Sequence, residues 1–130
     1  MPLTNGELFL RLLRNIKAIC NRELTNESFI YLYEAGEYWI AFEKSAYLLS
    51  LQLKGQKSEV SAIRMDFLPF PIIYCGIDDS TRQKLRCNND CISRNHCSYI
   101  KVKTTSSANV EEYNRWYQSN MKGNFINSRC

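Results

Sequence analysis

Three cysteines and a histidine that could bind zinc lie close together in the second half of the chain. They are Cys87, Cys91, His96 and Cys97, and the first two could share one face of a helix because they are four residues apart. Structural zinc sites usually take cysteines in pairs separated by two residues, and that spacing is absent here. The alternative is a helix end with incidental thiols, so the sequence leaves zinc binding by Cys87, Cys91 and Cys97 open.

No set of residues indicates an enzyme. His96 is the only histidine, and no sequence pattern supports a nucleophilic pair with Cys91 or Cys97. The adjacent carboxylates Asp78 and Asp79 are explained better as the cap of a helix than as a metal site. A glycine-rich phosphate loop of the Walker type is absent from the sequence. We therefore expect a non-catalytic protein without a cofactor.

The chain is mildly basic. It contains 17 Lys and Arg residues against 13 Asp and Glu residues, which gives a formal net charge of +4. This charge permits contact with nucleic acid but does not demonstrate it, because phosphate binding needs cations that are clustered in space. No apolar run approaches the roughly 18 residues of a membrane helix, and no secretory signal pattern is present. We expect a cytoplasmic protein that has no membrane partner.

The pattern of apolar residues predicts a single α/β domain with a mixed β-sheet flanked by helices. The domain should span residues 1–120, and residues 121–130 should form a flexible tail.

Most thiols should be free, and Cys20 and Cys75 should be small core residues because they fall within apolar patterns. The predicted helices cover residues 4–20, 43–53 and 78–91 and the segment after 109, and the predicted strands cover 29–33, 38–42, 60–65, 72–76 and 98–103.

A β-hairpin is the clearest local prediction. Residues 29–33 and 38–42 are rich in aromatic and β-branched side chains, which favour strands. Gly36 lies between them and can adopt the positive φ that a tight turn requires. Because side chains alternate along a strand, Tyr38 and Ile40 should share one face of the sheet and Trp39 should lie on the other.

The hairpin and the helix after it resemble the opening signature of the MutS mismatch-repair family. Gly36, Phe42 and Ala46 match that signature without a gap, and Tyr38 and Trp39 stand where the family has Phe and Tyr. A second segment, 70–77, is similar to the family's conserved Pro-Met-Ala/Cys-Gly stretch. The resemblance covers residues 1–104 and implies the fold of the MutS N-terminal domain, here without the rest of that protein.

In the MutS family this domain contacts mispaired DNA. A Phe wedges beside the mispaired base, and a Glu two residues later hydrogen-bonds to that base; the corresponding residues here are Tyr38 and Ile40. A tyrosine ring can still stack on a base, but isoleucine can neither donate nor accept a hydrogen bond. The resemblance thus implies a DNA-contacting module whose reading motif is altered to Tyr38-Trp39-Ile40.

Two functions remain open after the sequence analysis. The first is a non-catalytic module that binds double-stranded DNA, and the second is a protein-interaction or accessory domain, for example of a mobile element, that kept the fold and lost DNA contact. Positive charge around an exposed Tyr38 would favour DNA, whereas an exposed apolar patch without it would favour a protein partner. The residues expected to contact DNA are Tyr38, Ile40 and Gly36 on the hairpin and the basic residues Arg11, Arg14, Lys101 and Lys103.

Overall fold

A computed structural model describes residues 5–53, 59–66, 68–85, 89–93, 98–104, 109–121 and 125–127. The helices in this part of the chain are α1 (Asn5–Arg14), α2 (Ile16–Leu24), α3 (Glu43–Gln52), α4 (Asp79–Gln83) and α5 (Val110–Met121). The strands are β1 (Phe29–Ala35), β2 (Tyr38–Phe42), β3 (Glu59–Arg64), β4 (Ile72–Asp78), β5 (Asn89–Ser93), β6 (Ser98–Lys103) and β7 (Phe125–Asn127).

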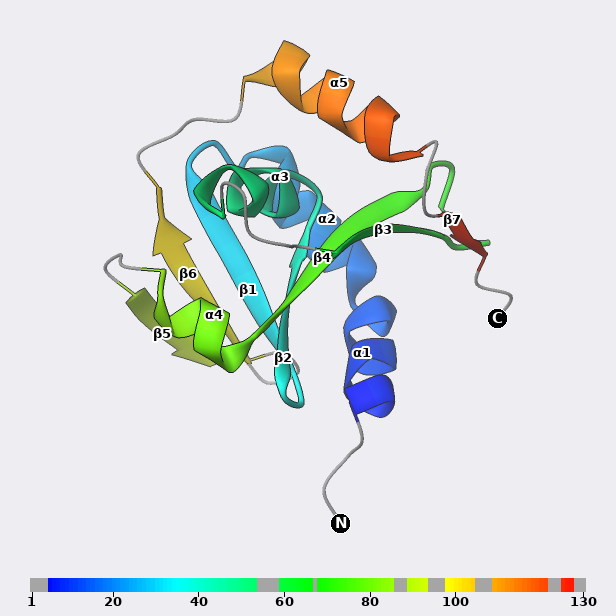
Figure 1. Ribbon diagram of the computed structural model, residues 1–130. Helices are drawn as coiled ribbons and strands as arrows, with labels where there is room; N and C mark the ends of the chain where they lie inside the picture. The colour runs from blue at the N-terminus through cyan, green and yellow to red at the C-terminus, as the bar shows by residue number, and fades with distance from the viewer. Residues whose placement is uncertain are drawn as a thin grey trace.

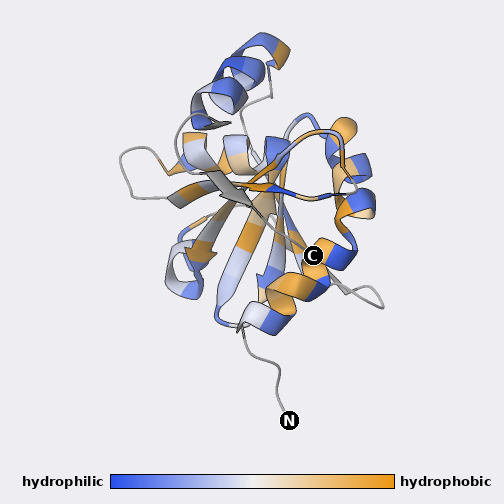
Figure 2. Ribbon diagram, turned by 90° about the vertical axis from the view of Figure 1, so that its right-hand side faces the viewer, coloured by the Kyte–Doolittle hydropathy of each residue, from blue (hydrophilic) through white to orange (hydrophobic). Residues whose placement is uncertain are grey.

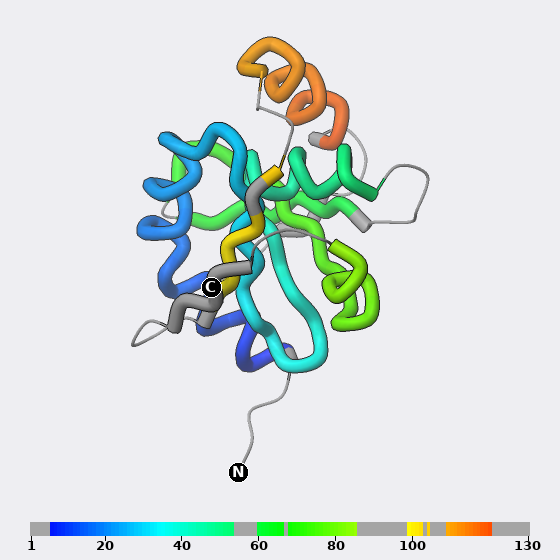
Figure 3. Tube along the Cα trace, turned by 90° about the vertical axis from the view of Figure 1, so that its left-hand side faces the viewer, coloured from blue at the N-terminus to red at the C-terminus, as the bar shows by residue number. Residues whose placement is uncertain are grey.

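One twisted sheet forms the centre of the fold (Figure 1). Its strand order is β5-β6-β1-β2-β4-β3-β7. Every neighbouring pair is antiparallel except β3 and β7, which are parallel. Viewed from the β5–β6 edge, α1 and α2 lie on one side of the sheet and α3 lies on the other, with α5 beyond it (Figure 3). The predicted α/β class with a mixed sheet flanked by helices is therefore confirmed.

Each face of the sheet has its own apolar core. On one face the apolar side of α1 and α2 packs against side chains that include Tyr33, Ile40 and Phe42. On the other face α3 packs against side chains that include Leu32 and Cys75. Two cores form because successive side chains of a strand point to opposite faces. In Figure 2 hydrophobic and hydrophilic residues are interspersed along α1, as expected for a helix that covers a sheet, whereas α5 is mainly hydrophilic.

Most of the predicted elements are present, and the hairpin is confirmed with strands that extend from Phe29 to Ala35 and from Tyr38 to Phe42. The helix predicted over 4–20 is divided at Asn15, whose side-chain amide donates to the carbonyl of Arg11 at 3.1 Å. Residues 125–127, within the segment expected to be a tail, form β7 and pair with β3.

The helix predicted to run from residue 78 to residue 91 is wrong in its second half. Asp78 caps its start as expected, because the Asp78 side chain accepts a hydrogen bond from the Thr81 backbone N–H at 2.7 Å. The helix ends at Gln83, however, and Asn89–Ser93 form strand β5. This strand pairs with β6 along the edge of the sheet, so a tertiary pairing that local sequence does not reveal decides its structure.

Candidate functional site

Tyr38 lies at the tip of the β1–β2 hairpin, directly after the turn. Gly36 adopts a φ of 69°, which is the left-handed conformation predicted for it. In the sheet register, Tyr38 lies opposite Ala35 of β1 on one side and Asp78 of β4 on the other. The hairpin tip is next to the N-terminal end of α1 (Figure 1). Tyr38 remains 47% exposed, so it is a surface residue.

The Tyr38 side chain borders a depression of about 260 Å³ between the start of α1 and the sheet. Ile40 is only 7% exposed and therefore belongs to the buried base of this depression. The rings of Phe9 and Tyr74 lie next to each other, with their centroids 5.0 Å apart. We call this depression the Tyr38 hollow, and its lining residues are Gly6, Phe9, Ala35, Tyr38, Ile40 and Tyr74.

The charged residues nearest to Tyr38 in the sequence and in the sheet register are acidic. Glu37 precedes it in the turn, and Asp78 is its partner in β4. Hydrogen bonds from Thr81 hold the pKa of Asp78 below its usual value, so this carboxylate stays ionised at neutral pH. Among the described residues that line the Tyr38 hollow, none is basic.

Two of the predicted DNA-contacting cations lie on the outer side of α1. Arg11 and Arg14 are both exposed, and neither lines the hollow. Arg11 is two residues after Phe9, which places it about 200° around the helix from that ring. The structure therefore brings Gly36, Tyr38 and Ile40 together but points these arginines away from them.

The predicted cations of β6 are also remote from Tyr38. Lys101 lies opposite Tyr31, which is four residues from Ala35 and thus about 13 Å along the strand from the hairpin tip. The ammonium nitrogen of Lys101 is 4.2 Å from the centroid of the Phe29 ring, an arrangement that stabilises the sheet face. Lys103 has its backbone in β6, opposite Phe29, and its side chain lies outside the described residues.

Trp39 lies on the opposite face of the sheet from Tyr38, as the alternation predicted. Its indole N–H donates to Asp79 at 3.1 Å, and the Arg82 guanidinium lies 5.3 Å from the centroid of the Trp39 ring. Arg82 also forms an ion pair with Asp79 at 2.9 Å. These contacts tie α4 to β2 and pair the Asp79 carboxylate with the Arg82 guanidinium.

Two buried carboxylates form a second cluster, which sequence reasoning missed. Glu23, 3% exposed, accepts hydrogen bonds from the Ser45 backbone N–H at 2.8 Å and from the Asn26 amide at 3.1 Å. Glu43, which has a φ of 50°, accepts from the Ile73 N–H at 3.4 Å and from the Tyr113 hydroxyl at 3.2 Å. Burial raises the pKa of both carboxyls to about 7. Their hydrogen bonds link helices and strands, which indicates a structural role.

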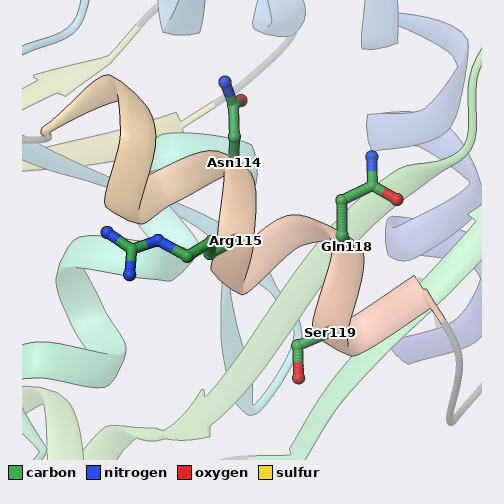
Figure 4. A pocket seen from close by; sticks show the side chains of 4 residues that line it. All are labelled: Asn114, Arg115, Gln118 and Ser119. Atoms are coloured by element: carbon green, nitrogen blue, oxygen red, sulfur yellow. The ribbon is translucent and has the colours of Figure 1, made fainter.

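Another depression, of about 420 Å³, lies against α5 and is bordered by Asn114, Arg115, Gln118 and Ser119. Figure 4 shows that these four side chains do not converge on one point. All four are exposed and come from one helix. This surface therefore lacks the enclosed geometry of a binding site.

The zinc hypothesis concerns residues that the structure describes only in part. The backbone of Cys91 is in strand β5, so Cys91 does not share a helix face with Cys87. Cys87, His96 and Cys97 lie outside the described residues. Within the described part of the chain, no group of three His, Cys, Asp or Glu residues could hold a metal ion. Cys75 is buried in the core, as predicted, and the Cys20 thiol is half-buried.

Comparisons of this chain with protein-family models, with curated proteins and with solved structures find no match. None of the described helices is both long and apolar enough to cross a membrane. The fold and the site together define an α/β domain with a mixed sheet and a small apolar hollow at one end of that sheet.

Proposed function

We propose that this protein is a non-catalytic interaction module that accepts an apolar side chain of a partner protein in the Tyr38 hollow. The observation that carries this proposal is the 47% exposure of Tyr38 at the edge of an apolar depression. A tyrosine suits such a position because its ring contributes a large apolar area while its hydroxyl can stay in contact with water. Tyrosine is also enriched among the residues that dominate binding energy at protein interfaces.

The size of the hollow favours a side chain over a cofactor. Its volume of about 260 Å³ falls below the roughly 300–1,000 Å³ that is typical of pockets for drug-sized ligands and cofactors. One leucine or phenylalanine side chain would occupy it without a large rearrangement. Burying such a side chain contributes about 2–3 kcal/mol, so an isolated short peptide should bind with a dissociation constant on the order of millimolar or weaker.

The signs of the neighbouring charges favour a protein over the DNA partner that the MutS resemblance implies. Affinity for DNA comes largely from cations that neutralise phosphates, whereas Glu37 and Asp78 adjoin Tyr38 in sequence and in the sheet register. Ile40, at the position of the base-reading glutamate, is buried and has no polar group to offer. DNA binding through Tyr38 is therefore the competing proposal.

A peptide titration tests the proposal. The ¹⁵N-labelled protein is titrated with an uncharged peptide of glycine and serine around one central leucine, and amide shifts are followed by NMR. We expect saturable shifts at the amides around the Tyr38 hollow, and at least a fivefold loss of affinity in Tyr38→Ala. The control is Phe70→Ala, because Phe70 is 41% exposed and precedes β4 at the end of that strand remote from Asp78. Unchanged affinity in Tyr38→Ala, or no shifts at the hollow, would contradict the proposal.

A further inference from the structure

We infer that the partner segment carries a lysine or arginine beside the apolar side chain that enters the Tyr38 hollow, an inference that rests on the proposed function. Its basis is the side-by-side position of Tyr38 and Asp78 at the end of β2 and β4. Side chains directly opposite each other on antiparallel strands have Cβ atoms about 5 Å apart. A residue of the partner next to the inserted side chain would therefore come within reach of Asp78.

Asp78 can receive such a cation because it is exposed and ionised. Its Oδ1 atom accepts the cap hydrogen bond from Thr81, and a carboxylate has further acceptor capacity on its second oxygen. Lys84 is near enough to help lower the Asp78 pKa, but the Thr81 hydrogen bonds are the larger cause. The neighbouring carboxylate of Asp79, by contrast, already forms an ion pair with Arg82.

The positive end of α1 is the main feature that opposes a cationic partner. Gly6, in the first turn of α1, lines the hollow, and a helix N-terminus carries about half a positive charge. Glu7 lies in the same first turn and offsets that partial charge. Because the ionised Asp78 carboxylate carries a full negative charge, it outweighs this partial charge, and the edge of the hollow beside Asp78 favours cations.

The apolar floor and the acidic edge together specify the chemistry of the partner segment. An apolar side chain fills the Tyr38 hollow over the rings of Phe9 and Tyr74, and a basic side chain within two residues of it reaches Asp78. The ion pair is exposed to solvent, so it adds selectivity more than affinity. We expect a basic peptide to bind about two- to fivefold more tightly than a neutral one at low salt.

Three matched peptides test the inference. Each contains a central leucine, with two lysines, two glutamates or two serines at the flanking positions, and each is titrated into the ¹⁵N-labelled protein at low and at high salt. The lysine peptide should bind most tightly and the glutamate peptide least, and the difference should shrink at high salt because exposed charges are screened. If none of the three shifts the amides around Tyr38, the proposed function itself fails. If they bind equally, or if the glutamate peptide binds best, only the inference fails.

Substitution of Asp78 tests whether its charge causes the preference for the lysine peptide. Asp78→Asn removes the charge but keeps a good helix-capping residue, so α4 should persist. This variant should lose the preference for the lysine peptide while binding the serine peptide as the wild type does. Asp66→Asn is the matched control, because Asp66 is exposed and follows β3 at the end of the sheet remote from Asp78. A lysine preference that survives in Asp78→Asn would overturn the inference.

Discussion

Tyr38 and Asp78 are direct partners in the antiparallel register of β2 and β4, so an exposed aromatic ring and an ionised carboxylate share one face of the sheet at the hairpin tip. This pairing supports the proposed protein-interaction function over DNA binding, the other function that the sequence left open. A wedge residue that approaches DNA needs cations around it to hold the phosphates. The cations expected for that purpose lie on the outer side of α1 and in β6, away from this pair.

The first prediction concerns DNA. Fluorescence anisotropy of labelled paired and mispaired duplexes, measured at two salt concentrations, should show the same weak binding for the wild type, Tyr38→Ala and Phe70→Ala. The physical reason is that the ionised Asp78 carboxylate beside Tyr38 repels phosphates. Tight, salt-sensitive binding that is lost in Tyr38→Ala and retained in Phe70→Ala would restore the DNA function that the MutS resemblance implies.

A second prediction concerns the pH dependence of stability. Burial raises the pKa of Glu43 from 4.5 to about 7 in the folded protein. The folded state therefore binds this proton more tightly than the unfolded state does, and the associated stability is full below about pH 4.5 and is lost as the pH rises through about 7. This rise in the pKa of Glu43 corresponds to at most about 3–4 kcal/mol.

Urea unfolding of the wild type and of Glu43→Gln at several pH values measures this effect. Glutamine cannot ionise, so the wild type should become progressively less stable than Glu43→Gln between pH 5 and pH 8, by about 1–3 kcal/mol. The control is Ser119→Ala on the exposed side of α5, which changes no ionisable group, so its stability relative to the wild type should not vary with pH. A constant difference between the wild type and Glu43→Gln would show that Glu43 titrates normally.

A third prediction concerns Asn26, which joins α2, β1 and α3. Its amide nitrogen donates to the carbonyl of Phe29 at 2.6 Å and to the Ser45 hydroxyl at 3.2 Å, and its oxygen accepts from the Phe29 N–H at 3.0 Å. Asn26→Ala leaves these buried groups and Glu23 with fewer partners, so it should lower the free energy of unfolding by about 2–3 kcal/mol. Asn21→Ala, an exposed position on α2, should change it by less than about 0.5 kcal/mol. Equal denaturation midpoints for the two variants would contradict this account.

The sequence predicted the elements that depend only on residues near one another in the chain. The β1–β2 hairpin follows from two aromatic and β-branched runs around Gly36, and the start of α4 follows from the capping side chain of Asp78. Strand β5 was missed because its pairing with β6 is a tertiary contact. The spacing of apolar residues in so short a segment does not distinguish a strand from a helix. The capping residues before the segment therefore favoured the helix.

The candidate site was predicted in part. Alternation along β2 placed Tyr38 and Ile40 on one face and Trp39 on the other. The hollow itself needs Phe9 of α1 and Tyr74 of β4, which are 65 positions apart in the sequence and meet only through the packing of α1 on the sheet. The burial of Glu23 and Glu43 was equally hidden, because a glutamate in a helical pattern is normally a solvated residue.

The most direct test of the central claim locates a bound leucine relative to Tyr38. Intermolecular nuclear Overhauser effects are measured between the leucine methyl protons of the lysine-flanked peptide and the aromatic protons of the protein. The account predicts contacts from those methyl groups to the rings of Tyr38, Phe9 and Tyr74. Contacts confined to other exposed aromatic rings, such as that of Phe70, would contradict it.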